Sequence, residues 1–135
     1  MLFRSFVVIA NGGGGIPTVR NADGSLAGVE AVIDKDLGAA LLARAIEVDL
    51  LVIATDVAHA VLGFGTPEAA DIGQVSLDQM RKYAADGHFA GGSMGPKVDA
   101  VCRFVASSGR RGVITDLGSI LAAAEGRAGT IVTPN

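Results

Sequence analysis

Short runs of β-branched residues alternate along this chain with longer stretches whose apolar residues recur at helical spacing. The short runs predict strands, because they are strongly apolar and closed by glycine or other turn-forming residues; they cover residues 6–10, 50–54, 112–114 and 130–132. The longer stretches predict helices at residues 34–46, 76–85, 96–105 and 116–124. This alternation favours a layered α/β fold with a largely parallel sheet.

Capping residues and apolar stripes define the predicted helices. Asp34 or Asp36 can cap the first helix, and its predicted inner face comprises Leu37, Leu41, Leu42 and Ala45. Pro96 fits the first turn of the third helix, whose predicted inner stripe comprises Val98, Val101, Cys102 and Val105. Turn-forming residues between Pro17 and Gly28 predict a hairpin, and residues 63–73 predict a loop.

Length and charge limit the classes of protein to which the chain can belong. Its 135 residues favour a single domain, with residues 1–5 as a stub outside the core. A net charge of -3 without a basic stripe argues against nucleic acid as a partner. Cys102 is the one cysteine, which excludes an internal disulfide and favours a reducing compartment. No apolar run is long enough to span a bilayer, and no signal peptide is recognisable, so we expect a cytoplasmic protein without membrane contact.

Three short stretches have the composition of a phosphate site. They are the glycine run at residues 12–17, the Ile-Asp-Lys-Asp stretch at 33–36, and the Gly-Ser-Met-Gly-Pro-Lys stretch at 92–97. Glycines let backbone N–H groups approach an anion closely, and lysines supply point charges. Lys97 falls in the first turn of a predicted helix, where a bound anion would offset the conflict between its charge and the helix dipole.

The position of these stretches fits the ligand-binding edge of an α/β sheet, which lies beyond the carboxyl ends of the strands. The glycine run follows the first predicted strand, and Thr55 and Asp56 follow the second. Two common nucleotide motifs are absent, however. Pro17 replaces a glycine of the dinucleotide fingerprint, and Lys97 is followed by Val98 rather than by the Ser or Thr of a P-loop.

Each candidate also has a purely structural interpretation. The glycine run could be a tight turn, Asp34 and Asp36 could be solvated helix caps, and Lys97 could be a surface lysine. In the functional interpretation, Asp36 orients Lys35 and a second lysine against a transferring phosphoryl group, a reaction that depends on positioning and charge neutralisation. His59 and His88 are interpreted as loop or partly packed residues, and no zinc site is predicted.

The order of several motifs closely resembles that of carbamate kinases, within the amino-acid kinase superfamily. The matching stretches run from about Phe6 over nearly the whole chain, and comprise residues 8–17, 28–36, 55–57, 64–67, 87–90 and 92–98. The resemblance implies a three-layer α/β/α sandwich. It also implies reversible phosphoryl transfer from ATP to carbamate, giving ADP and carbamoyl phosphate with Mg²⁺, and a place in arginine metabolism.

The resemblance also implies roles for individual residues. Lys35 and Lys97 match lysines that neutralise the transferring phosphate, and Asp36 matches the aspartate that organises them. The nucleotide side of the site corresponds to Thr55, Asp56 and Val57, flanked by Met94 and Pro96. A loop beside the active site corresponds to Gly12, Gly13, Gly14 and Gly15.

This chain departs from the family's pattern in two respects. The resemblance covers only the C-terminal, nucleotide-binding part, whereas the N-terminal part brings another glycine loop, another lysine and most of the carbamate pocket. After Thr55–Val57, an acid, a tyrosine and an asparagine of the family are replaced by Ala58, Val61 and Gly63, which removes aromatic area for stacking on adenine. We therefore expect a lone chain to be weakly active or inactive. It could instead be a stand-alone or split nucleotide-binding module that forms a homodimer or associates with a missing N-terminal half.

Overall fold

The computed structural model describes residues 6–89 and 93–135, and its centre is a four-stranded sheet. The strands lie in the order β3 (Leu51–Thr55), β7 (Gly112–Asp116), β8 (Thr130–Thr133) and β6 (Gln74–Ser76). The β3–β7 and β6–β8 pairs are parallel, but β7 and β8 are antiparallel. The predicted α/β class is confirmed, and the sheet is mixed, with its parallel pairs on either side of one antiparallel pair.

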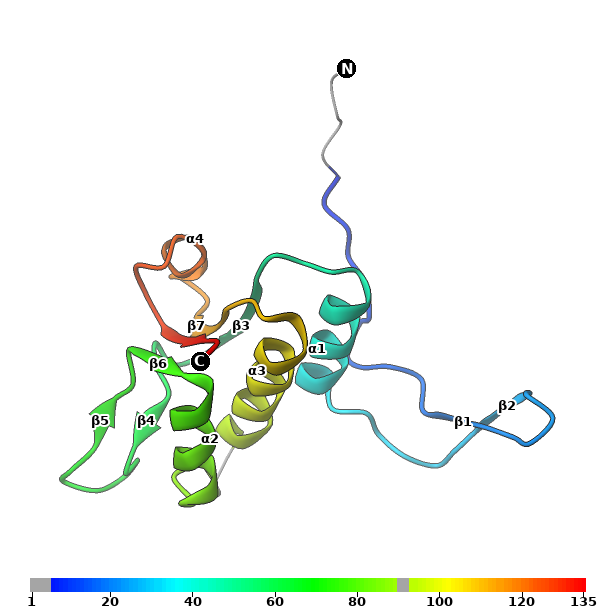
Figure 1. Ribbon diagram of the computed structural model, residues 1–135, viewed down its shortest axis with the longest axis horizontal. Helices are drawn as coiled ribbons and strands as arrows, with labels where there is room; N and C mark the ends of the chain where they lie inside the picture. Colours follow the sequence, from blue (N-terminus) through cyan, green and yellow to red (C-terminus); the bar gives the residue numbers. More distant parts are fainter. Residues whose placement is uncertain (1–5, 90–92) are drawn as a thin grey trace.

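Helices cover both faces of this sheet (Figure 1). On one face lie α1 (Lys35–Ala45), α2 (Leu77–Ala85) and α3 (Met94–Ser108), and on the other lies α4 (Ile120–Ala124). Successive side chains of β7 point to opposite faces of the sheet. Ile114 belongs to the larger core under α1–α3, whereas Val113 packs with Ala123 of α4. The three-layer arrangement follows from this alternation, because successive strand side chains point to opposite faces.

The stripe predicted for α3 is confirmed, since Val98, Val101, Cys102 and Val105 are all buried. The inner face predicted for α1 is partly wrong. Leu41 and Ala45 are exposed, and the small residues Ala40 and Ala43 are buried instead. Helix α1 therefore turns alanines toward α3, and small side chains there leave room for the two helices to pack closely.

The strand predicted at Phe6–Ala10 is wrong. Residues 6–10 form no strand, and four of these side chains are almost fully exposed, between 78% and 98%: Phe6, Val7, Val8 and Ile9. Figure 1 shows this segment leading away from the body of the molecule. A β-branched run favours an extended backbone, but a strand also needs a hydrogen-bonded neighbour, and no described strand runs beside it. The stub predicted at residues 1–5 lies outside the described residues.

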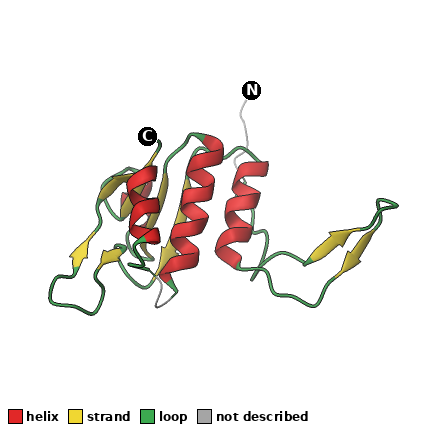
Figure 2. Cartoon of the chain, turned by 60° about the horizontal axis from the view of Figure 1, so that its bottom comes forward, coloured by secondary structure: helices red, strands yellow, loops and turns green. Residues whose placement is uncertain are grey.

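Two hairpins project from opposite ends of the body (Figure 2). The first pairs β1 (Thr18–Arg20) with β2 (Leu26–Gly28), as predicted from the turn residues between them. The second pairs β4 (Val61–Leu62) with β5 (Ala70–Asp71), within a stretch predicted mainly as loop. Within residues 6–89 and 93–135, every helix is too short or too polar to cross a membrane.

Candidate functional site

A buried ion pair joins the first turns of α1 and α3. The Lys97 Nζ atom donates to Asp36 Oδ2 across 2.9 Å, and the two residues are only 6% and 8% exposed. The two helices lie side by side and begin at the same end of the molecule (Figure 2). The predicted contact between Asp36 and a second lysine is therefore present in the structure.

Burial of this pair fixes the direction of both side chains. A buried charge is costly unless it is paired, so Lys97 is held toward Asp36 rather than extending into solvent. Helix α3 has no side-chain cap at Ser93, so the N–H groups of its first turn rely on other acceptors. The first turn of α3 thus combines backbone donors with an ammonium group, an arrangement that suits an anion.

Lys35 lies at the same end of α1 as this ion pair, and its side chain is exposed. The Asp34 carboxylate caps the helix by accepting from the Asp36 and Leu37 N–H groups. The pKa of Asp34 is lowered chiefly by the hydrogen bond from the Leu37 N–H, and burial opposes this by raising it. The Asp36 N–H and the charges of Lys35 and Lys97 lower the pKa further. The charges of Lys35 and Lys97 thus both favour the ionised Asp34 carboxylate.

The glycine loop packs against this same helix start. At Gly14, where φ is +152°, an added Cβ atom would lie 2.6 Å from the backbone oxygen of Ile33. At Gly12 and Gly13, no heavy atom lies within 4 Å of the position that an added Cβ atom would take. An added Cβ at Gly38 of α1 would lie 3.8 Å from the Gly15 nitrogen. The loop is thus placed by α1, and not by the strand predicted before it.

A cleft of about 460 Å³ lies between the end of β3, the β4–β5 hairpin and the start of α3. Three predicted nucleotide-side residues line it, namely Asp56, Val57 and Met94. Thr55 does not line it but donates its hydroxyl to Asp56 Oδ1 at 2.9 Å. Pro96 is exposed on the same helical turn as Lys97, outside the cleft lining.

Met94 connects the cleft to the ion pair. It lies three residues before Lys97 on α3, and residues at this spacing are neighbours on a helix surface. Neither Lys97 nor Asp36 lines the cleft, so the ion pair and the cleft are linked through the first turn of α3. A cleft with apolar lining, one helical turn along α3 from a cationic residue, suits a ligand that has a flat apolar part and a polyanionic part.

Sequence reasoning missed several residues of the cleft wall. His59, Phe64 and His88 line it, although both histidines were interpreted as loop or packed residues. His88 Nδ1 accepts from the Gly63 N–H at 3.3 Å, and its ring meets Tyr83 edge-on. His59 Nδ1 lies 3.7 Å from Asp71 Oδ2. One sequence signal could have indicated a role for His88: it lies in residues 87–90, one of the stretches that carry the family resemblance.

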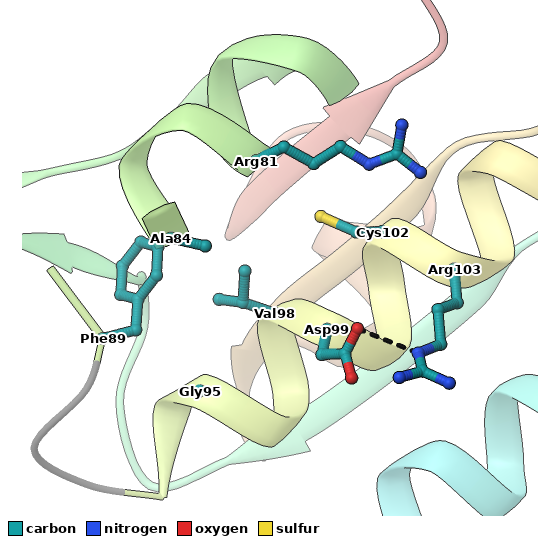
Figure 3. A pocket seen from close by; sticks show the side chains of 8 residues that line it. All are labelled: Arg81, Ala84, Phe89, Gly95, Val98, Asp99, Cys102 and Arg103. Atoms are coloured by element: carbon teal, nitrogen blue, oxygen red, sulfur yellow. Dashed lines mark hydrogen bonds and ion pairs between the residues drawn. The ribbon is translucent and has the colours of Figure 1, made fainter. Parts of the chain in front are cut away.

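A second hollow, of about 340 Å³, lies between α2 and α3 (Figure 3). Its polar lining includes Arg81, Asp99, Cys102 and Arg103, but Asp99 already pairs with Arg103 at 2.9 Å. Burial raises the pKa of the Cys102 thiol to about 11, so the thiol stays protonated at neutral pH and is a poor nucleophile. This hollow contains none of the residues predicted for the site.

Comparison with known proteins now identifies the class of protein that carries this fold and site. A profile described as the amino acid kinase family matches residues 1–116. The chain belongs to the amino acid kinase family.

Similar proteins within that family are carbamate kinases. The carbamate kinase of Thermococcus kodakarensis is 46% identical over 129 residues, which are 96% of this chain and 41% of the relative. The carbamate kinase of Rhizobium meliloti is 47% identical over 135 residues, which are 98% of this chain and 40% of the relative. The chain thus spans about two fifths of the length of the curated relatives that it matches.

Solved structures show the same likeness in three dimensions. Carbamate kinase from Giardia lamblia bound to AMP-PNP superposes with a TM-score of 0.86 at 40% identity, over 91% of this chain and 43% of that one. Uridylate kinase from Archaeoglobus fulgidus has a TM-score of 0.58 at 20% identity, which shows a shared fold alone.

Proposed function

We propose that this chain is the C-terminal, nucleotide-binding part of a carbamate kinase-like phosphotransferase, folded as one domain. The reaction is ATP + carbamate ⇌ ADP + carbamoyl phosphate. The observation that carries the proposal is the buried Lys97–Asp36 pair, placed one helical turn from a cleft lined by Asp56, Val57 and Met94. The identities of 40% to 47% to carbamate kinases support the choice of substrates.

The chemistry assigned to these residues is positioning and charge neutralisation. In the direction of ATP synthesis, an oxygen of the ADP β-phosphate attacks the phosphorus of carbamoyl phosphate, and the bond to the carbamate oxygen breaks. Negative charge is then spread over the transferring oxygens, where ammonium groups lower the barrier. Lys35 and Lys97 are assigned to those oxygens, and Asp36 holds Lys97 in place. The glycine loop at Gly12–Gly15 borders this space from the α1 side.

Mg²⁺ fits this site as a companion of the nucleotide. Magnesium in kinases is usually held by one or two carboxylates together with substrate phosphates. In the part of the chain that the structure describes, no group of three or more His, Cys, Asp or Glu residues could hold a metal. Asp56, which lines the cleft, is the carboxylate that could meet an ion carried in on the phosphates.

The isolated chain is expected to bind nucleotide weakly and to turn over little. It spans about two fifths of its relatives' length, and the family resemblance assigns a further glycine loop, a further lysine and most of the carbamate pocket to the part that these residues do not match. We also propose a reducing, cytoplasmic location and a role in arginine metabolism. The single cysteine, buried and free, agrees with the location.

Titration with ADP and Mg²⁺ tests the proposal. The parent chain should bind ADP, and Lys97→Ala should bind it at least tenfold more weakly, with circular dichroism confirming that the variant is folded. Equal binding by a folded Lys97→Ala variant, or no binding by the parent, would overturn the proposal. Steady ATP synthesis from ADP and carbamoyl phosphate by the 135-residue chain would contradict the expected inactivity.

A second candidate function is a nucleotide-binding module that acts with a partner chain or as a homodimer. The favouring observation is the exposure of Phe6, Val7, Val8 and Ile9, each at least 78% accessible to solvent. Contiguous exposed apolar side chains mark interaction surfaces. Sedimentation of the chain as a sharp monomer at high concentration would count against this function.

A further inference from the structure

One aromatic side chain at the cleft has no part in the core. Phe64 lines the cleft and is 78% exposed, whereas Phe89, on the same lining, is only 6% exposed. An exposed phenyl ring at a cleft rim costs hydrophobic free energy in the free protein. It offers a flat apolar face that a planar ligand could cover.

The hairpin that carries Phe64 is fixed firmly at its base. Thr130 of β8 accepts there from the Ala60 N–H at 2.8 Å and donates to the Ile72 oxygen. The Ile72 N–H in turn donates to the Ala60 oxygen at 2.8 Å. These bonds hold the two ends of the hairpin together and join them to the central sheet.

The turn that presents Phe64 has its own support. Gly63 has a φ of +59°, in the left-handed region, and its oxygen accepts from both the N–H and the hydroxyl of Thr66. Its N–H donates to His88 Nδ1 across the cleft wall. This bond joins the residue directly before Phe64 to the segment that follows α2.

The arrangement matches the two ends of a nucleotide. Phe64, Val57 and Met94 supply apolar side chains to the cleft lining, and Lys97, which does not line the cleft, lies one helical turn beyond Met94 on α3. A base has a flat π-face, and aromatic stacking on a base contributes substantial affinity whatever the base. A polyphosphate joined to that base could extend toward the lysine.

We propose that Phe64 is the base-stacking residue of this chain, and that His88 is a positioning residue that holds the Phe64 turn through the Gly63 N–H. This inference rests on the nucleotide-binding function proposed above and names the residue that contacts the nucleotide base. Phe64 would then supply aromatic area in place of the family's tyrosine, which is replaced here by Val61. His88 acts through the backbone, and its ring accepts a hydrogen bond only while Nδ1 is unprotonated.

Paired ligands test the role of Phe64. Phe64→Ala should weaken ADP binding at least about fivefold, as expected for a lost stacking contact, and should leave pyrophosphate binding within about twofold, because pyrophosphate lacks a base. Since the chain has no tryptophan, Phe64→Trp places the only indole of the chain at the rim, where its fluorescence can be excited apart from that of Tyr83. ADP should quench it and pyrophosphate should not.

The outcomes separate this inference from the function on which it rests. If the parent binds ADP and Phe64→Ala binds it equally well, the stacking role is wrong and nucleotide binding stands. Quenching of Phe64→Trp by pyrophosphate as strongly as by ADP would also refute the stacking role. If the parent binds neither ligand, both proposals fail.

A conservative pair tests His88. His88→Gln keeps an acceptor for the Gly63 N–H and should retain ADP affinity within about threefold, whereas His88→Leu has no acceptor and should approach the affinity of Phe64→Ala. Equal affinities of His88→Leu and His88→Gln would refute the positioning role.

Discussion

Lys97 and Asp36 are 61 positions apart in the sequence, yet the Nζ and Oδ2 atoms lie 2.9 Å apart in a buried contact. This one ion pair joins the starts of two helices and sets one boundary of the candidate site. Its removal should therefore affect both the folding and the ligand binding of this chain.

Asp36→Ala should strongly destabilise the fold. The change leaves the buried Lys97 ammonium without its partner, which typically costs about 3–5 kcal/mol. Urea unfolding should show a lower midpoint with an unchanged slope. Asp99→Ala is the matched control, because it breaks the exposed pair with Arg103 and should change the midpoint little. Equal losses in the two variants would contradict the assigned importance of burial.

Lys35→Ala should separate ligand binding from stability. The Lys35 side chain is exposed, so its truncation should leave the urea midpoint nearly unchanged. Affinity for pyrophosphate should nevertheless fall several-fold, since one of two assigned cations is lost. Lys82→Ala, in an exposed position on α2, serves as the control for the loss of one positive charge. Equal effects of the two variants on pyrophosphate binding would argue against a local role for Lys35.

The Asp34 cap should make stability depend on pH in the acid range. The pKa of Asp34 is lowered from 3.8 in the folded chain, so folding favours the ionised form. Its contribution is present above pH 3.8 and is lost as pH falls through the folded pKa. Asp34→Ser keeps a capping oxygen but no titrating group. The parent should thus lose more stability than Asp34→Ser on acidification, and parallel profiles would contradict this.

Cys102 should react slowly with alkylating reagents. Its pKa is raised from 9.0 to about 11, so the folded chain has about a hundredfold less thiolate at pH 8 than an ordinary thiol. The side chain is also only 5% exposed. Mass spectrometry with iodoacetamide should therefore show slow labelling that accelerates in urea. Labelling of the native chain at the rate of the unfolded chain would contradict this account.

Local sequence signals predicted much of the structure around the site. The Asp34 cap, the α2 start at Ser76 and the buried stripe of α3 follow from hydrogen bonding and periodicity within one turn or helix. The pairing of Asp36 with a second lysine was predictable from charge and from the resemblance. Such features depend on neighbours in sequence or on a recognised motif.

Features that depend on tertiary neighbours were not predictable in the same way. The run at Phe6–Ala10 has strand composition but no described strand beside it. The antiparallel direction of β8 against β7 depends on how the chain returns after α4, which no local pattern fixes. His88 joined the cleft wall through a contact with Gly63, 25 positions away. Each of these outcomes was decided by packing between distant segments.

The most direct test compares ADP with adenosine on the parent chain and on Asp36→Leu/Lys97→Met, which replaces the buried ion pair by apolar residues. Such a replacement can leave a fold as stable as the parent, and urea unfolding checks this. The account predicts that the parent prefers ADP at least tenfold and that the folded double variant binds ADP no better than adenosine. A double variant that keeps the parent's preference for ADP would contradict the assignment of Lys97 to the phosphates.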